Sequence, residues 1–426
     1  MSIDEGSPDL SDIDLLDPDR FARLEHHDMF RRLRAEDPVH WTEEPNGPGF
    51  WSVTKHADLI TINRDAQGFS SEIGGVNIAE MDHVEGAFDT RGQMMLMTDP
   101  PKHTRYRLLV NKGFTPRMIS LIEEHLRFRA ELIVDSVIER GECDFVTDLA
   151  AELPLQAIAE IMGVPQEERH LLFDWSNRLI GADDPEYMTD PGSQENATMA
   201  AAELYVYATS LREDRASEPR DDIVTKLINA EIGGDKLTEA EFDMFIMLLA
   251  VAGNETTRNA TAHGMHALLT NPDELAKLRA DPGLIDSAIE EIVRWATPVL
   301  YFRRQATVPL ELRGRRIEPG DKVVMWHISA NRDEDVFVDP FRFDVARTPN
   351  DHIGFGGGGA HFCLGANLAR MELRLIFEEI LARFDGMALV GEPERLRSNF
   401  IGGIKHMPVT FTPGARRHPV GAVAEG

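Results

Sequence analysis

The arrangement of apolar and polar residues predicts a long helix in the second half of the chain. An apolar run over 242–251 follows the segment Thr238-Glu239-Ala240-Glu241. A hydroxyl residue with a carboxylate three positions later forms a capping box, which marks a helix start. The apolar pattern continues to Leu269 and stops before Asn271-Pro272, because proline disfavours helix in the residue before it. We expect a helix from about residue 239 to residue 269.

The middle of this helix departs from its own pattern. It reads Ala252-Gly253-Asn254-Glu255-Thr256-Thr257. Glycine, a charged residue and β-branched residues are poor choices for the centre of an apolar helix. A local rule broken inside an otherwise consistent element is typical of a functional site.

Weaker patterns predict the remaining elements. Residues 101–271 are mostly helical in pattern, and two more helices are expected from about Leu284 to Ala296 and from Cys363 to about Phe384. The segment 70–98 has little periodicity and reads as a long loop, a class that is often functional. Short strands are expected over 50–54, 307–312, 316–317 and 322–326, with a hairpin strand over 404–412. The fold class is therefore mainly α with small β-sheets (α+β).

Composition narrows the functional classes. The 426 residues carry a net charge of −29, which argues against binding to nucleic acid. The start of the chain is acidic and polar, unlike a signal peptide. No run of about 18 uncharged apolar residues predicts a transmembrane anchor, so a cytoplasmic location is expected. Residues 1–17 read as a flexible tail, followed by one domain over 18–426.

The two cysteines lie in different contexts. Cys143 has an ordinary turn-like neighbourhood and is expected to be structural, whereas Cys363 follows four consecutive glycines, 356–359. Glycines allow positive φ and a close approach to a flat ligand. A thiolate at a helix start is stabilised by the helix dipole, and Phe355 and Phe362 can shield it from water. A zinc site is not expected, because Cys143 lacks ligand spacing.

This loop resembles the haem-binding signature of the cytochrome P450 superfamily. Phe355 lies eight positions before Cys363, one more than in the commonest pattern, which resembles an actinobacterial branch. Four further segments match family motifs in the right order. They are His103-Thr104-Arg105-Tyr106-Arg107, the centre of the long helix, Glu291-Ile292-Val293-Arg294 and Pro340-Phe341-Arg342-Phe343.

The resemblance implies a triangular, helix-rich single domain that binds haem b, with Cys363 as the iron ligand. Two haem propionates would need partners, since buried carboxylates require them. Arg304 is assigned that role, and its neighbour Arg303 fits a solvated surface position better. The cofactor-binding residues implied by the resemblance are His103, Arg107, Gly253, Arg304, Phe355, Gly356, His361, Cys363 and Gly365.

The resemblance also assigns the chemistry. Gly253 leaves space for dioxygen, while Glu255 and Thr256 relay protons to it as general acids. The alternative for Thr256 is a hydrogen bond back to a helix carbonyl. Glu291 and Arg294, three apart on one helix face, are expected to form a structural network with Arg342.

Electrons are expected from NAD(P)H through a separate ferredoxin reductase and ferredoxin, because the chain has no flavin region and too few cysteines for an iron–sulfur cluster. An acidic ferredoxin is predicted to dock near the thiolate side. The basic residues proposed for this contact are Lys102, Arg105, Lys112, Arg370 and Arg374, with scattered solvated charges as the alternative.

Two function classes remain in view. The first is a monooxygenase that inserts one atom of O2 into a C–H bond. The second is a haem-thiolate isomerase, peroxygenase or sensor that needs no external electrons. The Glu255–Thr256 pair favours the first, because relatives that use peroxide typically lack it.

The substrate is expected to be hydrophobic. Long segments, among them 152–158, resemble actinobacterial enzymes that oxidise sterol side chains and methyl-branched lipids at a terminal carbon. An apolar pocket suits a steroid, terpenoid or fatty acyl chain, although several of its candidates could simply fill the core. The candidates are Val76, Ile78, Met94 to Met97, Leu249, Ala252, Val299, Leu300 and Ile401.

Overall fold

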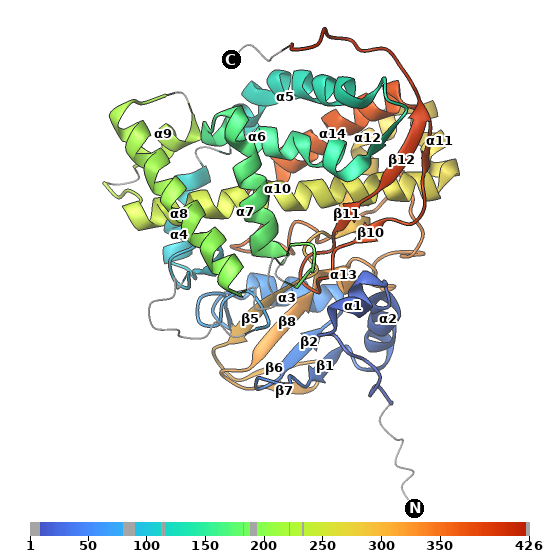
Figure 1. Cartoon of the computed structure of the whole chain (residues 1–426). Helices are drawn as coiled ribbons and strands as arrows, with labels where there is room; N and C mark the ends of the chain where they lie inside the picture. Colours follow the sequence, from blue (N-terminus) through green and yellow to red (C-terminus); the bar gives the residue numbers. More distant parts are fainter. Residues whose placement is uncertain are drawn as a thin grey trace, which may run out of the picture.

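The computed structural model describes residues 9–79, 90–111, 114, 116–181, 183–187, 194–220, 222–231 and 234–422. Most helices gather in one part of the molecule, and the largest sheet lies in the other with α1, α2 and α3 (Figure 1). The predicted fold class, mainly α with small sheets, is confirmed.

The helices of the described residues follow one another along the whole chain. They are α1 (Pro18–Ala22), α2 (His26–Glu36), α3 (His56–Arg64), α4 (Lys102–Val110), α5 (Pro116–Val137), α6 (Glu152–Met162), α7 (Arg169–Ile180), α8 (Gln194–Ser217), α9 (Ile223–Ile228), α10 (Glu239–Thr270), α11 (Pro272–Ala280), α12 (Ile285–Ala296), α13 (His327–Ala330) and α14 (Ala366–Arg383).

The largest sheet has the order β1-β2-β8-β5-β3, in which β2 and β8 run parallel and the other neighbours antiparallel. Smaller sheets pair β4-β12-β9, β10-β11 and β6-β7. The strands are β1 (Val39–Thr42), β2 (Phe50–Val53), β3 (Phe69–Ser70), β4 (Glu142–Asp144), β5 (Tyr301–Ala306), β6 (Leu310–Leu312), β7 (Arg315–Ile317), β8 (Lys322–Trp326), β9 (Asp385–Leu389), β10 (Glu394–Arg395), β11 (Ile404–His406) and β12 (Pro408–Thr412).

Helix α10 is the central element and packs against α6, α7, α8, α12 and α14 (Figure 1). Its start is the predicted capping box: the Glu241 amide donates to Thr238 Oγ1, and the Thr238 amide donates to the Glu241 carboxylate. Because the helix is surrounded, most of its residues are buried, so the polar residues at its centre lie inside the protein.

The chain before α1 is packed against the core where it is described. Leu10 and Leu15 are buried in one apolar cluster with Phe21, Phe30 and Trp326. The prediction of a flexible tail over 1–17 is therefore wrong for residues 9–17, because two leucines anchor them. Residues 1–8 lie outside the described residues.

Two strand predictions are corrected. The segment 404–412 is not one hairpin strand, because β11 pairs with β10 while β12 pairs with β4 and β9. Strand β5 was not predicted; it reads Tyr-Phe-Arg-Arg-Gln-Ala over 301–306 and places two buried arginines between apolar residues. None of the helices within the described ranges combines the length and apolar character needed to cross a membrane.

Candidate functional site

The glycine loop before α14 is held against α3. Gly356, Gly358 and Gly359 have φ of +93°, +89° and +77°, values that favour glycine. A Cβ on Gly359 would lie 2.0 Å from the Asn63 carbonyl oxygen, so this position also needs glycine for close packing. The loop thus brings Cys363 to its place three residues before α14.

Cys363 is anchored through its backbone and has an accessible side chain. Its amide donates to the Phe355 carbonyl at 3.0 Å. Protein atoms around the exposed Cys363 thiol partly desolvate it and so raise its pKa, while the Gly365 amide, Arg107 and Arg370 oppose that shift. A coordinated metal ion would deprotonate such a thiol outright, so these opposing groups suit a thiolate that is a metal ligand.

The aromatic ring of Phe355 is fixed from outside. The Arg370 guanidinium lies 4.4 Å from its centroid, and the same guanidinium binds Glu290 with contacts of 2.6 and 2.8 Å. A ring held in this way stays beside the cysteine loop despite the additional loop residue.

Four basic groups lie around this loop, and among the described residues the acid that acts on Arg304 and His103 is Asp99, which forms no ion pair with either. Arg304 is buried and donates to the Arg303 carbonyl at 2.8 Å, and burial lowers its pKa to about 10. The rings of His103 and His361 are 4.2 Å apart. Burial lowers the pKa of His103 to about 4 and that of His361 to about 2, with Arg107 and Arg304 adding to both shifts.

These groups fit the propionates of a haem. Within the described ranges no carboxylate lies in ion-pair distance of Arg107 or Arg304, and His103 Nδ1 is a buried atom without a hydrogen-bond partner. Buried cations without partners are costly. Two ligand carboxylates beside a thiolate donor would satisfy them, and so the donor set fits the cofactor that the sequence predicts. A Cβ on Gly365 would meet nothing within 4 Å, which agrees with a ligand contact there.

The centre of α10 separates its two predicted catalytic residues. Thr256 Oγ1 is partly exposed and donates to the Ala252 carbonyl at 2.8 Å, which is the back bond weighed as the alternative. Glu255 is 1% exposed and bonded to Arg258, which in turn reaches Asn177 Oδ1 at 3.0 Å. Successive residues on a helix point in different directions, so Glu255 faces α7 and has no bond to Thr256.

The environment of Glu255 shifts its protonation equilibrium. Burial raises the pKa of its carboxyl group, and Arg258 opposes that shift without cancelling it. One carboxylate oxygen, Oε1, has no hydrogen-bond partner.

Gly253 has a packing role that the sequence did not predict. A Cβ on this residue would lie 2.3 Å from Cδ1 of Ile158 in α6. The missing side chain therefore allows α6 and α10 to approach each other. A side chain at position 253 would point toward Ile158 in α6. The absence of a side chain therefore opens space toward α6, which is not the space predicted for dioxygen.

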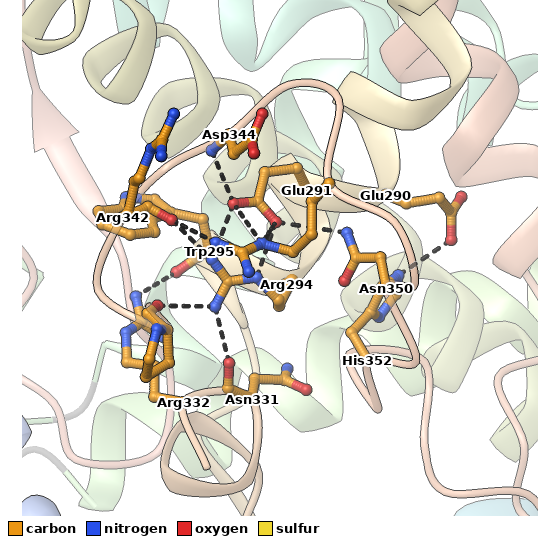
Figure 2. Close-up of polar contacts among 12 residues, drawn as sticks. Glu290, Glu291, Arg294, Trp295, Asn331, Arg332, Arg342, Asp344, Asn350 and His352 are labelled. Carbon is orange, nitrogen blue, oxygen red and sulfur yellow. Dashed lines mark hydrogen bonds and ion pairs between the residues drawn. The ribbon is translucent and has the colours of Figure 1, made fainter. Parts of the chain in front are cut away.

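The structural network around Glu291 exists, but with a different second arginine (Figure 2). Arg294 forms two bonds to the Glu291 carboxylate, at 2.7 and 2.8 Å. Arg347 supplies the next, with Nε at 3.0 Å from Oε2. The prediction of Arg342 is wrong: its side chain is 63% exposed and points away from Glu291, and only its carbonyl oxygen accepts bonds from Arg294 and Arg347.

The pocket candidates divide into accessible and core residues. Ala252 is exposed, and Met94, Leu96 and Val299 are partly exposed. Ile78 and Leu300 instead belong to the buried cluster around Trp326, so they act as core residues. The others are buried and apolar: Val76, Met95, Met97, Leu249 and Ile401.

The basic residues predicted for ferredoxin docking are mostly paired within the chain. Arg105 binds Asp235 and Glu241, and Arg374 binds Glu123 at 2.9 Å. Lys102 donates to the Gly92 carbonyl and is exposed. Lys112 lies outside the described residues.

The prediction that Arg303 is solvated is wrong, since its residue is 1% exposed and its guanidinium donates to the carbonyls of residues 77 and 78.

Sequence reasoning missed two arginines of the site. Arg258 lies three residues after Glu255, a spacing that places both on one helix face, so that signal was available. Arg347 is separated from Glu291 by 56 positions, and no local pattern links them.

Comparisons with known proteins identify the family of this chain. The family model "Cytochrome P450" matches residues 191–402. A protein of Mycolicibacterium smegmatis named steroid C26-monooxygenase is 45% identical over 97% of this chain and 96% of its own length. A methyl-branched lipid omega-hydroxylase of Mycobacterium tuberculosis is 43% identical over 90% of both chains.

Solved structures show the same fold. A Mycobacterium marinum cytochrome P450 in complex with pseudoionone has a TM-score of 0.87 and 40% identity, over 94% of this chain and 98% of that one. A Bacillus megaterium protein in complex with corticosterone has a TM-score of 0.80 and 31% identity, over 92% and 99%.

Proposed function

Since this chain belongs to the cytochrome P450 family and is a monooxygenase of hydrophobic substrates, we propose that it hydroxylates a terminal methyl group of a branched lipid, with a steroid side chain as the first candidate. The observation that carries this substrate class is the 45% identity to a steroid C26-monooxygenase over 97% of the chain. Apolar candidates such as Val76, Met97 and Leu249 suit such a guest.

The residues around Cys363 would bind haem b. Cys363 would provide the axial sulfur, while Arg107, Arg304, His103 and His361 would bind the two propionates. Haem held through a thiolate supplies the electron density that favours cleavage of the O–O bond. Because His103 and Arg304 are buried and Arg107 and His361 are partly buried, their hydrogen bonds to carboxylates would be stronger than in water.

Proton delivery is proposed for Thr256 and Glu255. Thr256 Oγ1 lies on the accessible side of α10 beside Ala252 and would hold a proton at that oxygen. Glu255 retains its proton more readily than a solvated carboxyl group because burial raises its pKa. To reach Thr256, its side chain would leave Arg258 and rotate around the helix.

Electrons are proposed to come from NAD(P)H through a ferredoxin reductase and a ferredoxin in the cytoplasm. Lys102 is the basic residue that remains most suitable for an acidic ferredoxin, since Arg105, Arg370 and Arg374 are already bound by carboxylates of this chain. The alternative function without external electrons is not favoured by the comparisons, whose relatives are named as a monooxygenase and a hydroxylase.

The substrate proposal is tested by spectral titration and product analysis of the reconstituted protein. The probes are a sterone with an intact side chain, a methyl-branched fatty acid and a monoterpene. Hydroxylation at a terminal methyl of either of the first two supports the proposal. Turnover of the monoterpene alone, or tight binding only of a small polar compound, would overturn the substrate class and leave the haem assignment intact.

A further inference from the structure

A second cavity lies outside the residues assigned to the haem site. It has a volume of about 200 Å³ and is bounded by α2, the last turns of α10, the end of α12 and the segment after β10. Of the predicted pocket residues only Leu300 lines it. Its basic lining consists of His26, His27, His263, His266, Arg332 and Arg395, and Thr270 and Ser398 add hydroxyl groups.

Several of these polar groups are buried without a partner. Arg332 is 4% exposed; its Nη2 donates to the Trp295 carbonyl at 2.7 Å, but Nε and Nη1 have no acceptor. His26, also 4% exposed, has an unpartnered Nδ1, and His263 has an unpartnered Nε2. Buried polar groups without hydrogen bonds are uncommon in native proteins and call for an explanation.

The charge around the cavity is one-sided. Across the described residues, no carboxylate lies in ion-pair distance of Arg332 or Arg395. Two acids act on these basic groups without forming an ion pair with them. Glu392 acts on Arg395 and His266. Glu291 acts on Arg332 but is already bound by Arg294. In a chain with a net charge of −29, two arginines that face a cavity without acids indicate that something else supplies negative charge.

A metal ion does not explain the four histidines. Among the described residues, the one group of ligand atoms close enough to share a metal ion is Glu186, Glu394 and His406, elsewhere on the surface. The cavity histidines therefore do not converge on a point, and the two arginines would repel a cation.

We propose that this cavity is a second ligand site that binds one small oxyanion, of the phosphate or carboxylate class. Guanidinium groups bind both classes through paired N–H donors. A volume of about 200 Å³ is below the range of about 300 Å³ and more that drug-sized ligands occupy, so the ligand is an inorganic anion or one acid group. Partly exposed His27, His266 and Arg395 form the solvent-facing rim through which it enters.

The site is connected to the rest of the fold through Arg332. The preceding residue, Asn331, accepts a bond from Arg294 through its carbonyl at 2.8 Å and binds the Ile353 amide through Oδ1 at 2.8 Å. Figure 2 shows Arg332 beside these contacts. Bound anion would neutralise the buried guanidinium and stabilise the folded protein.

The histidines make binding depend on pH. In the free protein, burial lowers the pKa of His26 to about 3, and the charges of Arg332 and Arg395 add to that shift. Burial also lowers the pKa of His263 to about 3, with Arg395 adding to the shift. Both rings are neutral near pH 7. An anion favours the charged form of a neighbouring histidine, so anion binding takes up protons and becomes tighter as pH falls.

The experiment titrates the holoprotein with orthophosphate at constant ionic strength set with chloride, followed by calorimetry and thermal unfolding. We expect one saturable site and a higher melting temperature. Arg395→Gln is expected to weaken binding by about tenfold or more, as for loss of a charge-assisted hydrogen bond. Arg397→Gln, the same charge change on a side chain that binds Asp19 instead, is expected to leave it unchanged.

Further arms separate the ligand classes. Acetate and sulfate distinguish planar from tetrahedral anions, and sulfate measured at pH 4.5 and pH 8 tests the histidines without titration of the ligand. Tighter sulfate binding at pH 4.5 supports the site. The proposal would be overturned if none of the three anions showed a saturable site. It would also be overturned if Arg395→Gln bound the anion as tightly as wild type, or if Arg397→Gln lost as much affinity as Arg395→Gln.

Discussion

Two threonines of α10 make the same bond in different surroundings. Thr256 Oγ1 donates to the Ala252 carbonyl at 2.8 Å, and Thr261 Oγ1 donates to the Thr257 carbonyl at 2.9 Å. Thr261 is 1% exposed, whereas Thr256 is partly exposed. The two threonines therefore share the same local bond and differ in their accessibility.

Thr256→Ala is expected to retain haem and substrate binding while the yield of product per electron falls by about tenfold or more, because a positioned proton donor contributes on the order of 10²-fold. The remaining electrons should appear as hydrogen peroxide. The measurement compares product formed with NAD(P)H consumed. Thr261→Ala is the matched control, and equal coupling in the two variants would remove Thr256 from proton delivery.

Glu372 in α14 predicts a pH dependence of stability. Burial raises the pKa of its carboxyl group to about 8, with a bond from Thr257 opposing the shift. Between the unfolded value and about 8 the folded state holds one proton more than the unfolded state. The free energy of unfolding therefore falls as pH rises through this window, by at most about 1.4 kcal/mol per pH unit.

Denaturant unfolding from pH 5 to pH 9 measures this dependence. Glu372→Gln should flatten the fall, whereas Glu378→Gln on the same helix, where Glu378 binds Arg127 near the surface, should retain it. A slope that is the same in wild type and Glu372→Gln would contradict the assignment.

At the level of elements, the loop from 338 to 350 is positioned by contacts with Glu291 of α12, which its local sequence pattern does not indicate. Arg347 is 8% exposed and bound to fully buried Glu291, whereas the Arg342 side chain is 63% exposed. The resemblance placed Arg342 in this network because the segment Pro340-Phe341-Arg342-Phe343 matches a family motif. Only the path of the loop reveals that Arg347 returns to Glu291. Capping of α10 was predictable because its signal is local.

Arg347→Gln is expected to destabilise the protein by about 1.5–3 kcal/mol, as for loss of a hydrogen bond to a charged group, because Arg294 still pairs with Glu291. Arg342→Gln should change stability by no more than about 0.5 kcal/mol. Thermal unfolding with haem retention as a second signal compares the two. A larger loss in Arg342→Gln would restore the sequence-based assignment.

Across the whole molecule, the sequence allowed the helical fold class, the cysteine loop and the arginines near it to be predicted. It could not predict that residues 9–17 pack through Leu10 and Leu15, that Glu255 faces Arg258, or that four histidines from α2 and α10 share a cavity. Each of these depends on contacts between segments far apart in sequence, which local periodicity does not encode.

Exposed basic residues stand out against the net charge of −29 and are the candidates for contact with an acidic electron donor. If Lys102 contributes to docking of an acidic ferredoxin, Lys102→Glu should slow the second-order rate of reduction at low salt, by about tenfold at most for one rim charge. The difference from wild type should shrink as salt rises. Lys236→Glu serves as the control, since Lys236 lies near Glu231. Equal rates at every ionic strength would exclude Lys102.

The most direct test of the account is the absorption spectrum of the reduced, carbon monoxide-bound protein. Wild type and Cys143→Ser should both show the band of thiolate-ligated haem, because Cys143 lies in β4, and Cys363→Ser should lose it together with hydroxylation. Full retention of the thiolate band in Cys363→Ser, or its loss in Cys143→Ser, would contradict the assignment of Cys363 as the iron ligand.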